Sequence, residues 1–381
     1  MGELTYRSRF EYPGDDAFPE LSKVIGCIPK HCFVKNTWTS LYYLSYSLLL
    51  TLLLPILAWK ILPQPCSDSV LSILCWMMFA WIQGTVAWGC WVIGHECGHG
   101  AFLDNAFFQD LTGFLLHSAF LTPYFSWQRS HAVHHSRVNH ISEGESHVPA
   151  VSGIEPTIFG RFHDFIYEVL GEEGFAFFQV IKNLVLGWPL YLLMGASGGP
   201  IRGVSNHFLP FNDELFPGNE WKLKVLVSDL GVGSTLYLLY LWARFAKSWI
   251  PVLVLYVLPL LVLNGWLVLY TWLHHTDIDI PHFDKNHWHW VKGAFMTIDR
   301  EYGPILDFLH HRIGSTHVAH HICSRIPHYH ALEATEAIKN TFPQLYLYDR
   351  SPIWLALWRV ASKCRQVHPV DGNRFEYVPR N

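Results

Sequence analysis

The sequence predicts an all-α integral membrane protein with four transmembrane helices in two hairpins and a cytosolic cap of helices. Half of the 381 residues are hydrophobic and only 15% are charged, whereas a soluble domain carries roughly 25% charged residues. Four stretches reach the roughly 20 apolar residues that a bilayer crossing requires. No segment alternates cleanly between polar and apolar residues, so we expect no β-sheet.

The four spans fall into two pairs with short links. They are expected at residues 42–62, 70–94, 225–245 and 249–273. Two further apolar runs, 103–124 and 176–195, each contain at least one charged residue and a proline. We expect these two runs to be re-entrant or interfacial rather than spanning.

Lysine and arginine residues predict the orientation. They are frequent before the first span, at Arg7, Arg9, Lys23, Lys30 and Lys35, and absent from the link after it. Cytosolic loops carry such an excess, so we expect both termini on the cytosolic side. A single functional domain is then divided into an N-terminal segment (1–41), hairpin one (42–94), a first cap segment (95–224), hairpin two (225–273) and a second cap segment (274–381).

Charge and cysteine usage exclude some classes. The net charge of −4 argues against a nucleic-acid partner, which favours a basic surface. The eight cysteines form no CxxC pair and several lie in apolar runs, so we expect reduced thiols and no disulfide framework.

The 24 histidines are almost as numerous as the 27 lysines and arginines together, and many are clustered. The first cluster, His95 and His99, follows directly on the second span. Residues four apart share one face of a helix. This face can therefore present two imidazoles to a metal at the membrane surface.

Two further clusters have the pattern HxxHH. They are His131, His134 and His135, and His317, His320 and His321. On a helix, positions i, i+3 and i+4 converge on one side. All three clusters are expected on one side of the membrane, and their imidazoles suit two redox metal ions, iron or copper, with positions open for O₂.

A ninth ligand is expected at the exit of the fourth span, where His275 is favoured over His274. Other nearby histidines are weaker candidates, which we expect to be interfacial or to support the ligands: His282, His287, His289, His310 and His311.

Two other classes compete with this interpretation. Residues 95–99 also match HExxH, the zinc protease motif in which Glu96 would be the general base. A zinc hydrolase needs only three protein ligands, so it leaves both HxxHH clusters unused, and Gly98 weakens the helix. In the metal-site interpretation, Glu96 instead orients an imidazole. The second competing class is a metal transporter, which needs polar ligands inside its spans. The expected spans contain almost no ionisable residues, Asp229 being the main exception, so the sequence does not favour this class.

The chain resembles the membrane fatty acid desaturases, specifically the methyl-end (Δ12 and ω3) branch that includes plant-type microsomal oleate and linoleate desaturases. The resemblance covers nearly the whole chain and rests on PKHCF (29–33), HECGHGAF (95–102), PYFSW (123–127), GWPLYL (187–192), TIDREYG (297–303), HVAHH (317–321) and IPHYHALEATEAIK (326–339).

The resemblance implies a multi-pass protein of the endoplasmic reticulum membrane that acts on a fatty acyl lipid. The eight cluster histidines become ligands of two non-haem iron ions, and the family's ninth ligand supports His275. O₂ is then a co-substrate, and electrons come from an external cytochrome b5 and its NADH-dependent reductase. Whether the chain forms a homo-oligomer is left open. The family's buried acyl tunnel could be lined by Phe102, Phe125 and Trp127, for which interfacial packing is an equal alternative.

Regioselectivity is left open between two reactions. HECGH and HVAHH resemble Δ12 enzymes, which convert oleate to linoleate, and this reaction is slightly favoured. Gly100, HHRIG (310–314) and PHYH (327–330) resemble ω3 enzymes, which convert linoleate to linolenate, and a bifunctional enzyme would do both. Hydroxylases and epoxygenases share the scaffold. Ala132 and Val133 depart from the basic residues usual in plant relatives, but neither can bind a metal.

Overall fold

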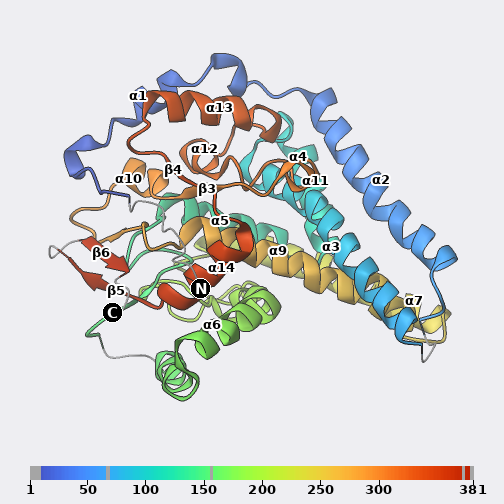
Figure 1. Ribbon diagram of the computed structural model, residues 1–381. Helices are drawn as coiled ribbons and strands as arrows, with labels where there is room; N and C mark the ends of the chain where they lie inside the picture. The colour runs from blue at the N-terminus through green and yellow to red at the C-terminus, as the bar shows by residue number, and fades with distance from the viewer. Residues whose placement is uncertain (1–9, 66–68, 155–157, 371–373, 378–381) are drawn as a thin grey trace.

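The computed structural model describes residues 10–65, 69–154, 158–370 and 374–377, and it is mostly helical (Figure 1). Arg7 and Arg9, which contribute to the expected orientation, lie outside the described residues. Long helices run towards one end of the molecule, and shorter elements gather at the other. The predicted helical membrane architecture is therefore confirmed at this level.

Five helices within the described residues are long and apolar enough to cross a bilayer, judged by length and composition. They are α2 (Thr37–Ile61), α3 (Val70–His99), α6 (Ile158–Met194), α7 (Gly218–Phe245) and the continuous run of α8 (Ile250–Val252), η3 (Leu253–Val257) and α9 (Leu258–His275). The first two and the last two of these five match the four expected spans to within one residue at the ends where an expected span extends beyond its helix, residues 62 and 249.

The expected count of four spans is not confirmed, because α6 contains all but the last residue of the run 176–195, for which the sequence predicts an interfacial position. Lys182 was one reason for that expectation, but its Nζ lies 3.0 Å from His163 Nε2 on the same helix. A local partner of this kind lowers the cost of a cation in an apolar segment. The helix bends at Gly171, whose φ of 69° is a left-handed value that suits glycine.

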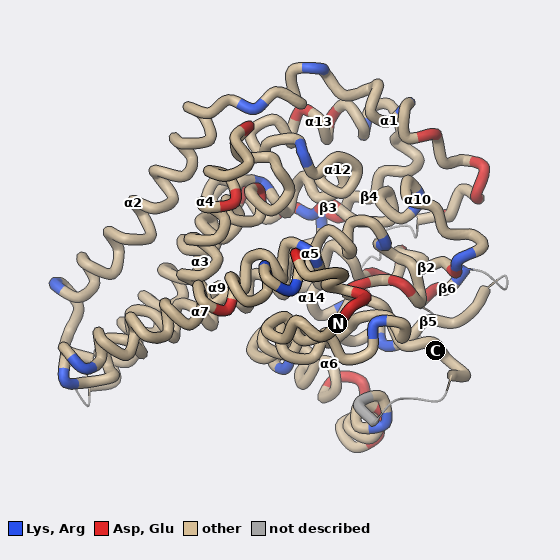
Figure 2. Tube along the Cα trace, turned by 180° about the vertical axis from the view of Figure 1, so that it is seen from behind, with Lys and Arg blue, Asp and Glu red and all other residues tan. Residues whose placement is uncertain are grey.

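Helix α3 is at the centre of the packing. It contacts α2, α4 (Ala106–Ala119) and α9, while α6 contacts α9 and α14 (Ile353–Lys363). Trp88, Trp91 and Leu263 are among the buried residues of the core between α3 and α9. Figure 2 shows the shafts of α2 and α3 almost free of charged residues, as expected for helices that face lipid. Helix α4 lies in the run 103–124 and is too short to span.

The remaining helices surround the ends of α3 and α9. They are η1 (Asp15–Ala17), α1 (Leu21–Cys27), η2 (Lys30–Phe33), α5 (Tyr124–Ser136), α10 (Trp290–Phe295), α11 (Pro304–Leu309), α12 (His317–Ile322) and α13 (His328–Thr341). A hydrophobic core joins α1, α10, α12 and α13 and includes Val24, Phe295, Val318 and Ile338. The chain thus builds a packed layer directly over the helix ends that carry histidines.

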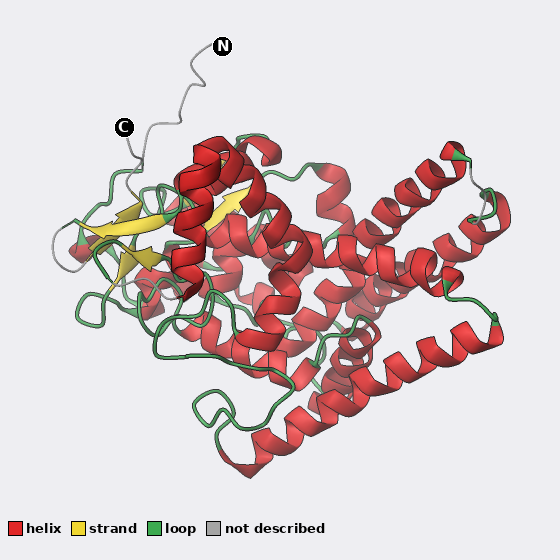
Figure 3. Ribbon diagram, turned by 90° about the horizontal axis from the view of Figure 1, so that it is seen from below, coloured by secondary structure: helices red, strands yellow, loops and turns green. Residues whose placement is uncertain are grey.

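The expectation of no sheet is wrong. A four-stranded sheet has the order β1 (Ala150–Val151), β5 (Gln366–Pro369), β6 (Arg374–Tyr377) and β2 (His282–Phe283), and β3 (Ile298–Arg300) pairs in parallel with β4 (Leu347–Asp349). Figure 3 shows these strands at the end of the molecule away from the tips of the long helices. Each strand has two to four residues, which is too short for an alternating pattern to be recognised.

Candidate metal centre

Four helices deliver the predicted histidines to one place. Helix α3 continues past the expected end of the second span and ends after His99, where Gly100 adopts a left-handed φ of 76°. Helix α5 carries the second cluster, α12 carries the third, and α9 ends at His275. The segments are distant in sequence, and their convergence depends on the tertiary fold.

Five of these histidines form what we call the first histidine group: His95, His99, His131, His135 and His320. One ring nitrogen of each lies within 4.8 Å of the others. The Nε2 atoms of His95 and His131 are 3.0 Å apart, and those of His135 and His131 are 3.2 Å apart. The rings therefore aim their nitrogens at a common point.

The other four form the second histidine group: His134, His275, His317 and His321. His275 Nε2 lies 3.1 Å from His134 Nε2 and 3.0 Å from His317 Nε2. The two groups are neighbours, because the rings of His135 and His321 stack with their centroids 4.1 Å apart. All nine predicted ligands are therefore placed in two adjacent nitrogen clusters.

The donor chemistry of both groups fits metal ions. Buried polar atoms normally have partners, yet His320 Nε2 and both ring nitrogens of His321 have no hydrogen-bond partner among the described residues. Metal binding requires neutral imidazole. Burial lowers the pKa of His134 and of His320 to about 3 and holds the pKa of His321 well below its usual value. The rings are thus kept in the form that binds metal.

The structure distinguishes His275 from the neighbouring His274. The ring of His274 contacts the backbone carbonyl of Ile298 and, at 3.1 Å, the hydroxyl of Tyr302. Both ring nitrogens of His274 therefore contact atoms outside the two histidine groups. The weaker candidates also lie outside them: His282, His287, His289, His310 and His311.

Two contacts that support these histidines could not be predicted from the sequence. Ser146 Oγ lies 2.9 Å from His134 Nδ1, which fixes the orientation of that ring. The Asp299 carboxylate accepts the Val318 N–H at 2.8 Å and so holds the start of α12. Asp299 lies within the TIDREYG motif, but nothing in its spacing indicates the contact with α12.

Gly98 has a steric role that the sequence did not suggest. A Cβ atom at this position would lie 2.7 Å from Cζ3 of Trp127. The indole of Trp127 in turn stacks on His131 with ring centroids 4.7 Å apart. The absence of a side chain at Gly98 thus lets Trp127 support a ring of the first histidine group.

The other two aromatic residues proposed for the tunnel are placed in a different cluster. Phe102 is buried with Cys97 and Tyr124, and Phe125 packs against the same cluster. Their role in an acyl tunnel stays a prediction.

The comparisons with known proteins decide the family. A family model described as fatty acid desaturase matches residues 72–352. The chain belongs to the fatty acid desaturase family. The predicted resemblance is thereby confirmed.

Several plant proteins are similar to this desaturase over most of its length. An oleoyl-12-hydroxylase from Ricinus communis is 38% identical over 91% of this chain and 86% of its own length. An omega-6 fatty acid desaturase, endoplasmic reticulum isozyme 1, from Glycine max is 39% identical over 91% of this chain and 85% of its own. A Δ12 fatty-acid desaturase from Arabidopsis thaliana is 38% identical over 90% and 86%.

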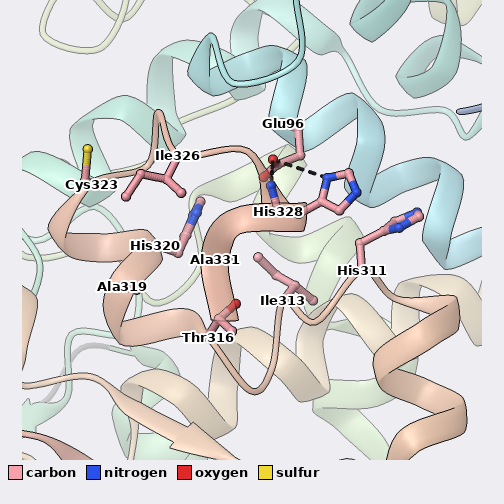
Figure 4. Close-up of a pocket in the computed structure, with 10 residues that line it drawn as sticks. All are labelled: Glu96, His311, Ile313, Thr316, Ala319, His320, Cys323, Ile326, His328 and Ala331. Carbon is pink, nitrogen blue, oxygen red and sulfur yellow. Dashed lines mark hydrogen bonds and ion pairs between the residues drawn. The ribbon is translucent and has the colours of Figure 1, made fainter. Parts of the chain in front are cut away.

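Glu96 of the desaturase serves a different purpose from the general base of a zinc protease. Its Oε2 accepts the backbone N–H of His328 at 2.9 Å and lies 3.6 Å from the Nδ1 atom of that residue, while its Oε1 is 3.9 Å from His95 Nδ1. Figure 4 shows Glu96 directly beside His328 at a small pocket that His320 also lines. Glu96 therefore ties the start of α13 to α3, and its contact with His95 is longer than a hydrogen bond.

The metal-free desaturase is expected to lose stability as the pH falls. The pKa of His134 and of His320 is about 3 in the folded chain and about 6.5 in an unfolded one. Between these values the unfolded state binds more protons, so acid favours unfolding. Melting temperatures of metal-stripped protein should therefore fall from about pH 7.5 to about pH 5. A melting temperature that rises over this interval would contradict the buried, neutral rings.

Proposed function

We propose that this chain is an O₂-dependent fatty acyl desaturase that introduces a cis double bond at Δ12 and converts oleoyl to linoleoyl chains. The observation that carries the proposal is the pair of adjacent histidine groups at the ends of membrane-length helices. The relatives named for Δ12 or omega-6 desaturation support the position of the bond. They do not favour the ω3 alternative.

Two non-haem iron ions are the cofactors that the donor set fits. The first histidine group would hold one ion with five imidazoles, and the second would hold the other with four. Nitrogen-rich ligation suits redox metals that bind O₂. Bound iron supplies the O₂-dependent oxidation that unactivated methylene groups require, because no side chain is basic enough to remove their hydrogens.

The protein contributes position and a dry environment. Trp91 and Trp127 are buried, and their rings stack on His95 and His131 of the first histidine group, so they exclude water from that side of the group. Ser146 orients the ring of His134. An acyl tunnel lined by Phe102, Phe125 and Trp127, which would select the carbons that react, belongs to the proposal.

The stoichiometry requires external electrons. Removal of two hydrogens from the chain together with reduction of O₂ to two waters consumes two further electrons and two protons. We assign their delivery to cytochrome b5 and its NADH-dependent reductase. The Glycine max relative is named as an endoplasmic reticulum isozyme, which supports placement of this multi-pass chain in that membrane. The excess of lysine and arginine before the first span is the basis on which we propose that both termini lie in the cytosol.

A fatty acyl 12-hydroxylase is the second candidate, because the Ricinus communis relative with that name has the same 38% identity as the Arabidopsis thaliana desaturase. Both reactions begin with the removal of hydrogen near the same carbon. They differ in whether a second hydrogen is removed or a hydroxyl group is added. Product analysis separates them.

Expression in yeast cells that make oleate but no linoleate tests the proposal. Gas chromatography of total lipids should show new linoleate, and cells fed linoleate should make no linolenate. A hydroxylated oleate in place of linoleate would assign the second candidate instead, and linolenate from fed linoleate would assign ω3 activity. Cells that carry the empty vector and cells that express the His320→Ala variant are the controls.

A further inference from the structure

A second set of metal-binding side chains lies outside the two histidine groups. It consists of His31, Cys32, His330 and Glu333, whose donor atoms all lie within 4.8 Å of one another. His31 and Cys32 come from η2 in the motif PKHCF, and His330 and Glu333 come from α13 in the motif IPHYHALEATEAIK. Both motifs contribute to the resemblance to the family. The proposed iron site gives no role to these four side chains.

The contacts within this set point its donors inward. His31 Nε2 lies 2.7 Å from Glu333 Oε2 and 3.9 Å from Cys32 Sγ. The rings of His31 and His330 meet edge to face with centroids 5.5 Å apart. His330 and Glu333 are three residues apart on α13 and therefore share one face of that helix.

The set is closed on one side and open on the other. Cys32 is completely buried, whereas the side chains of His31 and Glu333 are 58% and 50% exposed. An ion could therefore enter from solvent and meet a thiol fixed at the bottom of the site. An exposed histidine and glutamate pair alone contributes little to stability and leaves the convergence of Cys32 and His330 unexplained.

We propose that these four side chains bind one zinc ion, which fastens the N-terminal segment to α13. Zinc takes thiolate, imidazole and carboxylate ligands, and its structural sites are four-coordinate. Magnesium and calcium prefer oxygen ligands, of which this set offers only the Glu333 carboxylate. The soft thiolate also separates this site from the two histidine groups, which offer only imidazole nitrogen.

The position of this zinc site indicates a structural role. Helix α13 begins at His328, whose N–H is held by Glu96 beside the pocket that touches His320. The Asn36 N–H at the start of α2 donates to the hydroxyl of Tyr329 at 2.7 Å. Zinc would thus reinforce the attachment of α13 to α2 and steady the layer that covers the iron site. Its loss should lower activity without removing iron.

Metal content of the purified full-length chain in detergent tests the proposal. Mass spectrometry should find about one zinc per chain in addition to iron. Cys32→Ser and Glu333→Gln should each lose the zinc and retain the iron, and retained iron shows that the variant has folded. The matched control is Cys27→Ser, since Cys27 lies at the end of nearby α1 and its thiol contacts the Val24 carbonyl. Wild-type protein without zinc, or zinc that persists in Cys32→Ser, would reject the proposed zinc site.

Cobalt gives a second readout that is specific for the thiolate. Protein loaded with Co²⁺ should show a thiolate-to-cobalt charge-transfer band in the near ultraviolet, which the imidazoles of the histidine groups cannot produce. The band should disappear in Cys32→Ser and persist in Cys27→Ser. Its absence from the wild-type protein would reject Cys32 as a ligand. Neither readout depends on desaturase activity, so this proposal and the proposed function can fail separately.

Discussion

Replacement of His320 by alanine is expected to abolish product formation while the protein stays in the membrane. The His320 ring lies with its centroid 4.7 Å from those of His95, His99 and His135. Its Nε2 is buried and has no hydrogen-bond partner among the described residues. Loss of a residue that only supports a metal ligand costs about 10- to 100-fold, so loss of a ligand should cost more than about 100-fold.

The experiment compares His320→Ala with a histidine outside both groups. His134→Ala, from the second histidine group, should behave like His320→Ala. His287→Ala is the matched control, because His287 lies 3.4 Å from Asp284 and apart from both groups. Immunoblots of membrane fractions report protein amount, and gas chromatography reports product. Activity retained by either ligand variant, at normal protein level, would reject the assignment of that residue.

Replacement of Arg300 by alanine is expected to have the largest effect on stability. Arg300 is completely buried and forms ion pairs with Asp277, at 2.7 Å, and with Asp349. Burial raises the pKa of Asp277, but the charges of Arg300 and Arg359 hold it below the ordinary value. Both carboxylates are therefore ionised, and removal of one partner of such a buried pair costs about 3–5 kcal/mol.

The same arginine is tied to the metal centre. Its Nε donates to the Leu273 carbonyl at 2.9 Å, two residues before His275. Thermal unfolding of purified Arg300→Ala should therefore begin at a lower temperature, and its iron content should fall. Arg350→Ala is the control, because Arg350 is exposed and directly follows β4, the strand that pairs with the strand of Arg300. Equal melting temperatures for the two variants would show that the buried network does not hold the end of α9.

The histidine clusters that we propose as ligands could be recognised in the sequence because each depends on local helix geometry. His95 and His99, like the two HxxHH clusters, follow helical spacing, and each cluster does lie on a helix. The proposal of His275 rests on its position at the end of a span, and the structure places its ring beside His134 and His317. Which rings share a group could not be predicted, because neighbours such as His134 and His135 point into different groups.

Features that depend on distant contacts could not be predicted. The Lys182 partner His163 changes the interpretation of α6, but the sequence does not show that these residues meet. The strands are too short for a pattern to be seen, and the pairing of Ile298 with Leu347 joins residues far apart in the chain. The steric role of Gly98 depends on the packing of Trp127 against it, and the sequence does not show that these residues meet.

Iron analysis of the purified full-length protein tests the proposal that nine imidazoles in two groups hold two irons. We expect about two irons per chain, with a clear loss of iron in His320→Ala and in His275→Ala and no loss in His287→Ala. Protein that is active but contains no iron would contradict the claim. A second contradicting result would be protein that contains zinc in place of iron, if this zinc persists in Cys32→Ser and is lost in His320→Ala.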